Sequence, residues 1–333
     1  MVVAQGSSDS LSEEDYRGIP IHRFPFDAAL LRRDMSELGA ILKSVADLKR
    51  TFNPDLIHLN TSGPDVFFHL HTKDSVPSVD LFTVHFLPPT TLDENSLLGR
   101  CLKSSDWVAA VSQAMLDDAR GSVPEIGNRS SLIYNGLPMP PLRPAPLQFD
   151  GPRILCLGRV VPEKGFDTAL DALPAVLERF PDARLLVAGN GRAMPHLKTQ
   201  AARLGVQDCV EFVGWVDPEQ VPELINMATV VAMPSRWREP FGLVALQAAQ
   251  MARPVVAARV GGIPEIVIHQ QTGLLFEPEN STALAEQVVF LLRNPAEATR
   301  MGWTARRRAQ NVFGLERLVD SYDALYHRLL GTA

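Results

Sequence analysis

Residues 153–166 read RILCLGRVVPEKGF, a short apolar run that ends at a glycine and leads into a polar loop. The run has the length of a buried strand, and Gly158 stands where a loop would begin. Similar runs alternate with stretches of helical length, which is typical of a parallel α/β sheet. They are ARLLVAG at 183–189, CVEFVG at 209–214, TVVAMP at 229–234 and PVVAA at 254–258. We therefore expect an α/β fold with ligand-binding loops at the carboxyl ends of the strands.

The first half repeats this alternation less regularly, and a proline-rich stretch separates it from the second half. Its strand candidates are DLIHL at 55–59, SVDLFTV at 78–84, DWVAAVS at 106–112 and SLIYNG at 131–136. Neither helix nor sheet can continue through PMPPLRPAPLQFDGP at 138–152. We expect two domains, residues 1–142 and 143–314, with a helix at 315–330 returning to complete the first.

The composition excludes several classes of protein. The 333 residues carry a formal net charge of −6 and a pI near 5.8, which argues against a nucleic-acid partner. Cys101, Cys156 and Cys209 are widely spaced, so neither a disulfide framework nor a zinc site is expected. No apolar run approaches the roughly 18 residues that span a bilayer, and the N-terminus has no signal-peptide pattern. We expect a cytoplasmic protein.

The loop LGRVVPEKGF at 157–166 combines glycines with cations. It places Gly158, Arg159, Lys164 and Gly165 together, although the P-loop spacing GxxxxGK[ST] is absent. An arginine can chelate two oxygens and a lysine adds a point charge, so the loop suits a diphosphate. The alternative is an exposed loop with ordinary surface cations.

Two further strand-to-helix turns contain paired glycines. AGNGR at 188–192 contributes Gly189 and Gly191, and VGGIPEI at 260–266 precedes a short helical stretch. Each turn alone is a weak signal, because glycines are common at such turns. Three glycine-containing loops at one sheet edge indicate a binding site more strongly than any one of them.

The stretch SRWREPFGLVALQAAQ at 235–250 places a carboxylate in front of a helix. The first N–H groups of a helix have no partners within it, and Gly242 would let a ligand approach them. Leu243, Gln247 and Gln250 follow i, i+4, i+7 spacing, so both glutamine side chains share one stripe of this helix. A polar stripe therefore begins beside the loop. The alternative is a capped core helix with a solvated edge.

The first half offers fewer polar candidates. His85 ends the apolar run TVHF, where it is either functional or structural. Residues 60–63 read NTSG and follow another apolar run, and capping of the next helix is the favoured interpretation. The GxSxG and HExxH patterns are missing from the sequence, so serine-hydrolase and zinc-hydrolase mechanisms lack support.

Taken together, the motifs resemble those of family 4 of the retaining glycosyltransferases, a GT-B-fold group that includes sucrose synthases, lipopolysaccharide glucosyltransferases and phosphatidylinositol mannosyltransferases. The resemblance covers residues 151–333 and, more loosely, 50–136. It rests on GRVVPEKGFD, VAGNGR, FVGWV, MPSRWREPFGLVALQAA and ARVGGIPEIV, and on PDLIHLN, TVH, VAAVS and IYNG. It implies two Rossmann-like domains facing across a cleft, a nucleoside-diphosphate sugar such as a UDP or GDP sugar held mainly by the second, and transfer with retention. It also implies that no metal and no further cofactor are required.

The resemblance assigns roles to the loop residues. It implies that Arg159 and Lys164 hold the donor diphosphate and stabilise the departing nucleotide, within glycine-rich loops that contain Gly158, Gly189 and Gly191. Glu239 would bind donor-sugar hydroxyls, helped by the backbone N–H groups of three residues at the helix start. Those three residues are Phe241, Gly242 and Leu243.

The remaining assignments concern the nucleoside and the sugar. By the same resemblance, Trp215 and Val216 would contact the nucleobase through their backbone, and His85 would help to position the donor sugar. The family usually has a glutamate eight residues after Glu239, where it accepts hydrogen bonds from the ribose. Here that position is Gln247, which loses charge assistance of about 1 kcal/mol.

The start of the chain resembles the family from its second strand onward. The resemblance therefore implies that the first strand, its glycine-rich turn and the first helix are absent, and that a strand begins near Val2. Since an open strand edge invites pairing, we expect a rearranged first-domain sheet or a homodimer that covers the gap.

The leading hypothesis is a retaining glycosyltransferase with an unidentified saccharide, lipid-linked or small-molecule acceptor. The alternative is a weakly active or inactive relative that binds or hydrolyses nucleotide-sugar. Residues 28–50 read as a helix whose cations could rest on the inner face of a membrane, although a solvated helix face is the favoured interpretation. The cations are Arg32, Arg33, Lys43, Lys49 and Arg50.

Overall fold

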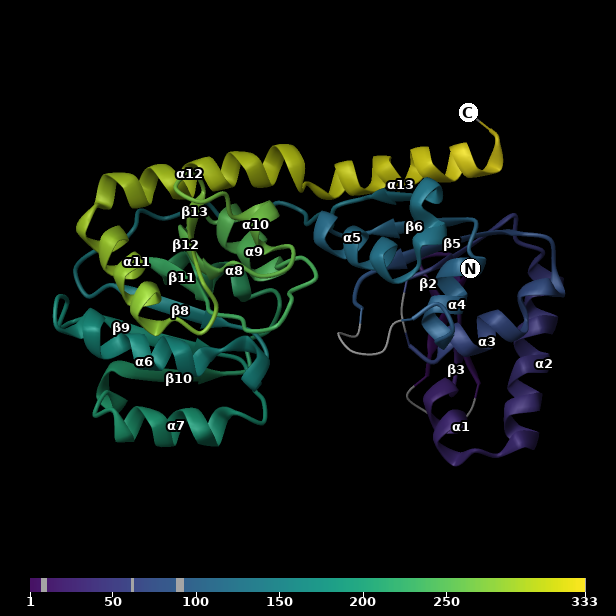
Figure 1. Cartoon of the computed structure of the whole chain (residues 1–333), viewed down its shortest axis with the longest axis horizontal. Coiled ribbons are helices and arrows are strands. Elements are labelled where there is room, and N and C mark those ends of the chain that lie inside the picture. The colour runs from purple at the N-terminus through teal and green to yellow at the C-terminus, as the bar shows by residue number, and fades with distance from the viewer. Residues whose placement is uncertain (7–10, 61–62, 88–92, 333) are drawn as a thin grey trace. The chain divides into compact units, whose positions relative to one another are not determined.

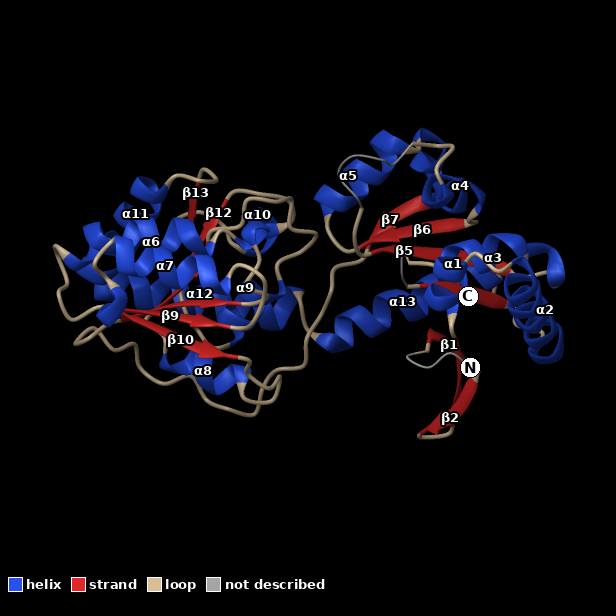
Figure 2. Ribbon diagram, turned by 90° about the horizontal axis from the view of Figure 1, so that it is seen from below, coloured by secondary structure: helices blue, strands red, loops and turns tan. Residues whose placement is uncertain are grey.

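The computed structural model describes residues 1–6, 11–60, 63–87 and 93–332, which divide into two compact units (Figure 1). The first unit comprises Met1–Val111, Met115–Ile133 and Tyr322–Ala333. The second comprises Ser112–Ala114 and Tyr134–Ser321. Each unit alternates strands and helices, as Figure 2 shows, so the predicted α/β class is confirmed.

The second unit is built on a parallel sheet with the strand order β10-β9-β8-β11-β12-β13. Five of these strands match the five predicted apolar runs, and the strand at 273–276 was not predicted. The strands are β8 (Arg153–Leu157), β9 (Arg184–Ala188), β10 (Val210–Gly214), β11 (Val230–Met233), β12 (Val255–Ala258) and β13 (Gly273–Phe276).

The strand order reverses direction between β8 and β11. The chain builds outward from β8 to β9 and β10, then returns to place β11 on the other side of β8. In open parallel sheets, ligands bind outside the carboxyl ends of the strands at such a reversal. The loops after Leu157 and Met233 therefore lie where a parallel sheet of this kind binds ligands.

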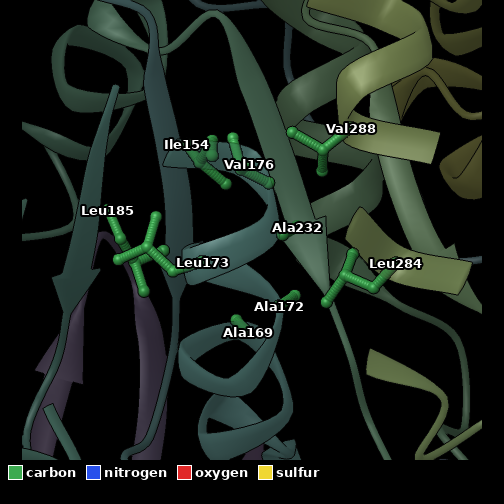
Figure 3. A pocket seen from close by; sticks show the side chains of 9 residues that line it. All are labelled: Ile154, Ala169, Ala172, Leu173, Val176, Leu185, Ala232, Leu284 and Val288. Carbon is green, nitrogen blue, oxygen red and sulfur yellow. The ribbon is translucent and has the colours of Figure 1, made fainter. Parts of the chain in front are cut away.

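Helices cover both faces of this sheet, and their apolar residues form its core (Figure 2). A cavity of about 10 Å³ remains among nine apolar side chains of β8, β9, β11, α6 and α11 (Figure 3). It is a packing gap, because a site that holds water needs polar partners. The helices are α6 (Phe166–Leu177), α7 (Met194–Arg203), α8 (Val221–Met227), α9 (Leu243–Gln250), α10 (Ile263–Ile266), α11 (Ser281–Arg293) and α12 (Pro295–Val312), with short 3₁₀ turns η3 (Pro162–Lys164) and η4 (Gln207–Cys209).

The proline-rich stretch 138–152 contains no helix or strand, as expected, and it packs against the second unit. Gln250 Nε2 donates to the carbonyl oxygens of Leu137 (3.3 Å) and Pro138 (3.1 Å). Arg253, which is 1% exposed, donates to Ala145 O at 2.6 Å. The side chains of Gln250, at the end of α9, and Arg253, just after that helix, therefore hold this stretch within the second unit.

Within the described part of the first unit, the strands form two sheets. A parallel four-stranded sheet has the order β4-β5-β6-β7, and a second sheet has the order β1-β3-β2, with β2 antiparallel to β3. The strand expected near Val2 is thus present as β1, and it pairs with β3. The strands are β1 (Val2–Gln5), β2 (Ser12–Tyr16), β3 (Ile19–Phe24), β4 (Leu56–Leu59), β5 (Val79–Val84), β6 (Trp107–Ala110) and β7 (Ser130–Leu132).

The helical stretch expected at 28–50 is two helices, α1 (Phe26–Arg32) and α2 (Met35–Phe52). Arg33 has a left-handed backbone with φ of 55°, and the Asp34 side chain caps α2 by accepting from the N–H groups of Ser36 and Glu37. A capping aspartate therefore starts a new helix inside the predicted one. The unit also contains α3 (Asp65–His71), α4 (Leu97–Ser104) and α5 (Gln113–Ser122), with 3₁₀ turns η1 (Lys73–Ser75) and η2 (Pro124–Arg129).

The five cations of residues 28–50 lie in different environments. Lys49 is buried, and Lys43 and Arg50 both pair with Asp47, at 2.7 Å each. Arg32 pairs with Glu37 at 3.0 Å. Three of the five cations are thus paired on the helix surface, Lys49 is buried, and Arg33 is exposed. None of the helices within the described residues is both long and apolar enough to cross a membrane.

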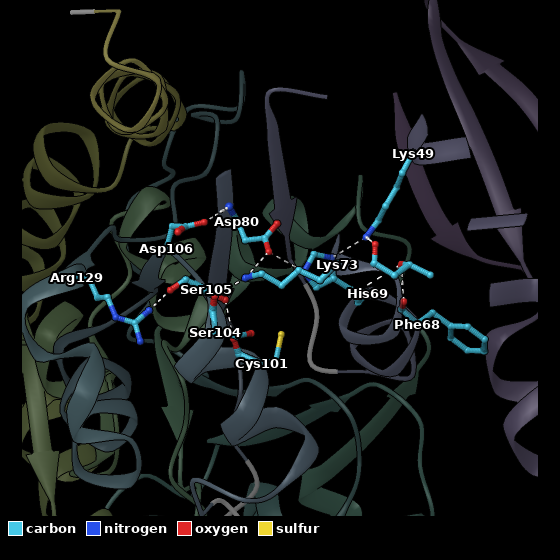
Figure 4. Close-up of polar contacts among 11 residues, drawn as sticks. Lys49, Phe68, His69, Lys73, Asp80, Cys101, Ser104, Ser105, Asp106 and Arg129 are labelled. Carbon is cyan, nitrogen blue, oxygen red and sulfur yellow. Dashed lines mark hydrogen bonds and ion pairs between the residues drawn. The ribbon is translucent and has the colours of Figure 1, made fainter. Parts of the chain in front are cut away.

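A buried polar cluster joins α2, α3, η1 and β5 (Figure 4). Asp80, which is 1% exposed, accepts from Lys73 Nζ at 2.8 Å and contacts His69 Nε2 at 3.2 Å. Lys49 Nζ donates to Thr72 O at 3.2 Å and lies 3.4 Å from His69 Nδ1. Burial lowers the pKa of Lys49 to about 8, opposed by the nearby charge of Asp80. Paired charges thus replace apolar packing at this end of the sheet.

The C-terminal helix α13 (Leu315–Leu330) matches the predicted 315–330, and its last turns pack on the four-stranded sheet of the first unit. His58 on β4 contacts Tyr326 Oη through Nδ1 (2.6 Å) and Thr83 Oγ1 through Nε2 (2.7 Å). Thr83 Oγ1 also contacts Tyr322 Oη at 2.8 Å. Burial, and to a lesser extent the charge of His85, lowers the pKa of His58 to about 4.

This network makes stability depend on pH. The imidazole of His58 is neutral when folded and binds a proton near pH 6.5 when unfolded, so its contribution is present above pH 6.5 and is lost as the pH falls towards 4. We expect wild-type protein to lose up to about 1.4 kcal/mol per pH unit more than His58→Gln in this window, measured by urea unfolding. His196→Gln, which removes an exposed imidazole, is the control. Equal slopes for wild type and His58→Gln would contradict this account.

Candidate active site

The loops at the reversal point of the second sheet bring together Lys164, which follows β8, and Glu239, which follows β11. Lys164 Nζ lies 2.5 Å from Glu239 Oε1. Both side chains are largely buried, with 19% of the lysine and 6% of the glutamate side chain exposed. Two residues that the sequence placed 75 positions apart in separate motifs therefore form one charged pair at the edge where ligands bind.

Ser235 and the backbone orient the carboxylate of Glu239. Ser235 Oγ donates to Glu239 Oε1 at 2.7 Å, so this oxygen accepts from both the serine and Lys164. The backbone carbonyl of Glu239 accepts from Gly262 N at 2.8 Å. With Oε1 engaged by two donors, Oε2 is the oxygen that the glutamate can offer to a ligand hydroxyl.

Four glycines at this edge serve contacts between loops. A Cβ atom on Gly165 would lie 1.9 Å from Pro234 O, one on Gly189 1.9 Å from Gly158 O, one on Gly191 2.2 Å from Val160 O, and one on Gly261 2.0 Å from Glu239 O. Each distance is too short for a side chain. These glycines let the backbones of neighbouring loops touch. Gly189 and Gly191 allow their own loop to pack against the loop after β8.

Gly158 differs from the other loop glycines. Its φ is 138°, which favours glycine, and its Cβ position is open with no atom within 4 Å. Arg159, the next residue, is exposed, and within the described residues its side chain forms no hydrogen bond or ion pair. Lys164 and Arg159 thus share a loop, but the structure joins only Lys164 to Glu239.

The start of α9 supplies backbone donors. Gly242 has φ of 107° and precedes the helix, and Phe241 is buried with 3% exposed. In the described part of the chain, the N–H groups of Phe241, Gly242 and Leu243 have no acceptor. Because these groups carry the positive end of the helix dipole, they can bind an anion or a hydroxyl oxygen.

Gln247 and Gln250 both line a groove of about 300 Å³, together with residues 137–141, Pro222 and Met251, which agrees with the expected polar stripe. The two side chains differ in exposure. Gln250 is buried and donates to the proline-rich stretch, whereas Gln247 is half-buried. The groove has the volume of a small-molecule site, and the proline-rich stretch supplies one wall.

Trp215 and Val216 directly follow β10, on the same edge of the sheet as the loops described above. Trp215 is 68% exposed and Val216 is half-buried. Their position is therefore compatible with contact to a ligand at this edge.

In the first unit, His85 directly follows β5 and its Nε2 lies 3.3 Å from Asn60 Oδ1. Partial desolvation of the ring lowers the pKa of His85. Thr61 and Ser62, the next two residues of the NTSG stretch, lie outside the described residues. The contact to Asn60 connects the ends of β4 and β5.

Sequence reasoning overlooked three residues of the 235–250 stretch. Ser235 bonds Glu239, Arg236 bridges neighbouring loops, and the Trp237 ring lies 5.7 Å from Lys164 Nζ. The partners of Arg236 and Trp237 lie in a loop distant in sequence, so local pattern could not reveal these contacts, whereas Ser235 lies only four residues before its partner Glu239. Among the residues that the structure describes, no group of three or more His, Cys, Asp or Glu side chains gathers to hold a metal ion.

Comparison with known proteins gives two family matches. The family described as "Glycosyl transferases group 1" matches residues 143–308, and that described as "Glycosyltransferase Family 4" matches residues 1–139. GDP-mannose-dependent alpha-(1-6)-phosphatidylinositol monomannoside mannosyltransferase from Mycolicibacterium smegmatis is 38% identical over 166 residues, covering 48% of this chain and 44% of that protein. Glycogen synthase from Mycobacterium tuberculosis is 35% identical over 173 residues, covering 52% and 42%. The matched segments therefore span less than half of these relatives.

Solved structures share the fold. Sucrose-phosphate synthase from Thermosynechococcus elongatus is similar with a TM-score of 0.82 and 23% identity, over 100% of this chain and 88% of that one. HepE from Anabaena, in complex with UDP and glucose, has a TM-score of 0.76 and 22% identity, over 93% and 86%. At these identities the likeness concerns the fold alone, and it confirms the expected GT-B class.

The loop contacts predict a sensitive position at Gly189. An alanine there would place its Cβ against Gly158 O and would be strained at φ of 125°. We expect Gly189→Ala to destabilise the protein by about 2 kcal/mol or more, measured as a lower thermal unfolding midpoint. Gly121→Ala is the control, because that helical position is open. An unchanged midpoint for Gly189→Ala would show that the two loops do not touch.

Proposed function

Because the chain belongs to the family 4 glycosyltransferases, we propose that it transfers a sugar from a nucleoside-diphosphate sugar to an acceptor hydroxyl, with retention of configuration. The observation that carries this proposal is the pair of Lys164 Nζ and Glu239 Oε1, 2.5 Å apart at the reversal point of the sheet. A cation and a hydrogen-bonding carboxylate side by side match the two halves of such a donor, an anionic diphosphate and a hydroxyl-rich sugar.

The diphosphate would lie over the loop after β8. Lys164 has three N–H donors, and contact with Glu239 leaves others for phosphate oxygens. The exposed guanidinium of Arg159 can chelate two further oxygens. The two cations would stabilise the negative charge that develops on the departing nucleotide, so this chain's own residues supply the electrostatic stabilisation without a metal.

The sugar would lie at the start of α9. Glu239 Oε2 accepts from a sugar hydroxyl, since Ser235 and Lys164 occupy Oε1. The unpartnered N–H groups of Phe241, Gly242 and Leu243 donate to nearby oxygens of the donor. Because the two oxygens of Glu239 have different partners, the carboxylate would fix the orientation of the sugar relative to the diphosphate.

The nucleoside would extend from the diphosphate towards Gln247. The amide of Gln247 reaches the groove of about 300 Å³, where it can accept one ribose hydroxyl. Trp215 and Val216 would contact the base through their backbone. Named relatives and neighbours include a GDP-mannose-dependent enzyme and a complex with UDP, so both bases are candidates for the donor.

His85 is assigned to the donor sugar on the resemblance of the TVH motif. Its lowered pKa keeps the ring neutral at pH 7, so it would act as a hydrogen-bonding group that positions the sugar. In the proposed transfer, the bond from the sugar to the phosphate oxygen breaks, and the acceptor oxygen bonds to the same face of the sugar. The departing phosphate takes the proton of the acceptor hydroxyl, which requires no protein nucleophile.

A second function is binding or hydrolysis of nucleotide-sugar without efficient transfer, and Gln247 favours it because the amide lacks a carboxylate's charge. An assay of donor consumption separates the two functions. UDP and GDP sugars are incubated with and without saccharide and lipid-linked acceptors. Consumption that requires an acceptor supports transfer, consumption in water alone supports hydrolysis, and binding without consumption supports the binding function.

The diphosphate assignment predicts a selective effect of removing the cations. We expect Lys164→Ala and Arg159→Ala each to weaken binding of UDP or GDP by about tenfold or more, and to leave uridine or guanosine binding unchanged. The two side chains are proposed to contact phosphate alone. Isothermal titration calorimetry measures both ligands, and equal losses for nucleotide and nucleoside would contradict the assignment.

The proposed contact of Gln247 with the ribose predicts that a carboxylate at this position strengthens donor binding. Gln247→Glu restores two charged acceptor oxygens for the ribose hydroxyls, so we expect the donor to bind several-fold more tightly. Gln250→Glu at the buried neighbour is the contrasting variant, which should destabilise the fold without improving binding. A donor dissociation constant that is unchanged or larger in Gln247→Glu would argue against a ribose contact.

A further inference from the structure

We propose that Arg236 is a positioning residue for the diphosphate site, which holds the Lys164 loop in the geometry that places the ammonium at Glu239. The inference rests on the proposed function, because it concerns the same site. It assigns no ligand contact to Arg236 itself.

Arg236 connects three loops at the carboxyl edge of the second sheet. Its Nη1 and Nη2 donate to the two carboxylate oxygens of Asp167, at 2.8 and 2.5 Å. Nη1 also donates to Pro162 O at 3.2 Å, and Nε lies 2.9 Å from Glu279 Oε1. Asp167 and Pro162 lie on either side of Lys164, so the guanidinium spans the segment that carries the lysine.

The backbone of Arg236 reinforces the same connection. Arg236 N donates to Glu163 O at 3.0 Å, one residue before Lys164. The two loops also meet closely at Gly165, where an added Cβ atom would lie 1.9 Å from Pro234 O. The loop after β8 is therefore held against the loop after β11 on both sides of Lys164.

The chemistry of the arrangement requires an arginine. Two parallel N–H donors match the two oxygens of the Asp167 carboxylate, and Glu279 Oε1 lies 2.9 Å from Nε in an ion pair without a hydrogen bond. A lysine would supply charge but not the two parallel N–H donors that match a carboxylate. The Arg236 side chain is 29% exposed, so these contacts are only partly screened by solvent.

The contacts of Arg236 bear on Lys164 in particular, because Lys164 is the last residue of η3, a single turn of three residues, Pro162–Lys164, that is followed by a left-handed glycine. A lysine has a long flexible side chain, and the site uses it as a point charge at 2.5 Å from Glu239. Ser235, the residue before Arg236, bonds the same carboxylate oxygen. One short segment thus positions the carboxylate directly and the lysine through the neighbouring loop.

A double-mutant cycle tests this role with nucleotide affinity as the readout. The variants are Arg236→Gln, Asp167→Asn, Lys164→Ala and the double variant Arg236→Gln with Lys164→Ala. Calorimetry measures the dissociation constants of UDP and uridine, or of GDP and guanosine, whichever nucleotide the protein binds. Arg179→Gln is the matched control, because within the described residues that exposed arginine forms an ion pair with Glu178 alone, at 3.9 Å.

We expect Arg236→Gln and Asp167→Asn each to weaken nucleoside-diphosphate binding about tenfold while nucleoside binding is retained. In the Lys164→Ala background, Arg236→Gln should cause little further loss, because a residue that acts through Lys164 has nothing left to position. Arg236→Lys should restore only a small part of the affinity. Thermal unfolding confirms that the variants compared are folded, and Asp167→Asn, which keeps the side-chain shape, covers the case in which Arg236→Gln does not fold.

The outcomes separate the two proposals. Full additivity of Arg236→Gln and Lys164→Ala, or equal losses for nucleotide and nucleoside, would overturn the positioning role and leave the diphosphate site intact. Wild-type affinity of Lys164→Ala for the nucleoside diphosphate would overturn the proposed site, and the role of Arg236 with it.

Discussion

The contact between Lys164 and Glu239 is the interaction on which the candidate site depends. It forms because the sheet order places β8 beside β11, so the loops that leave these strands meet at the carboxyl edge. Gly165 and Gly261 make the meeting possible, since a side chain at either position would overlap Pro234 O or Glu239 O. A largely buried carboxylate is tolerated here because the ammonium and the Ser235 hydroxyl both bond it.

In the proposed donor site, the same contact would meet two opposing demands of a nucleotide-sugar. A diphosphate needs positive charge, while sugar hydroxyls need acceptors, and a carboxylate beside a phosphate would repel it. In the proposed site, Lys164 would lie between the diphosphate and the sugar, where it would offset the charge of Glu239 and retain donors for phosphate. The N–H groups at the start of α9 add partial positive charge on the same side. Arg236 and Asp167, which contribute no net charge as a pair, hold the loops without altering this balance.

The two units are stabilised by different means. The second has a continuous apolar core in which helices pack on both faces of one sheet. The first also has buried apolar residues, such as the cluster that includes Phe24, Phe26 and Phe68, and it adds buried polar contacts at two places. These are the cluster around Asp80 and the network of His58, Thr83, Tyr322 and Tyr326. Burial raises the pKa of Tyr322 to about 12 and lowers that of His58 to about 4, so both groups are neutral near pH 7. The first unit is therefore the one whose stability should follow pH.

Local pattern alone predicted five of the six strands in the sheet of the second unit and the helix at 315–330, because apolar runs of strand length and helical periodicity depend on near neighbours. It also singled out Lys164 and Glu239 by residue type and setting. Pattern could not separate α1 from α2, find β13, or show that Lys49 and Gln250 are buried. The pairing of Lys164 with Glu239, the use of Gly189 and Gly191 against the neighbouring loop, and the contacts of Arg236 were decided by the tertiary structure. Each of these joins segments far apart in the chain, and only the order of strands in the sheet brings such segments within bonding distance.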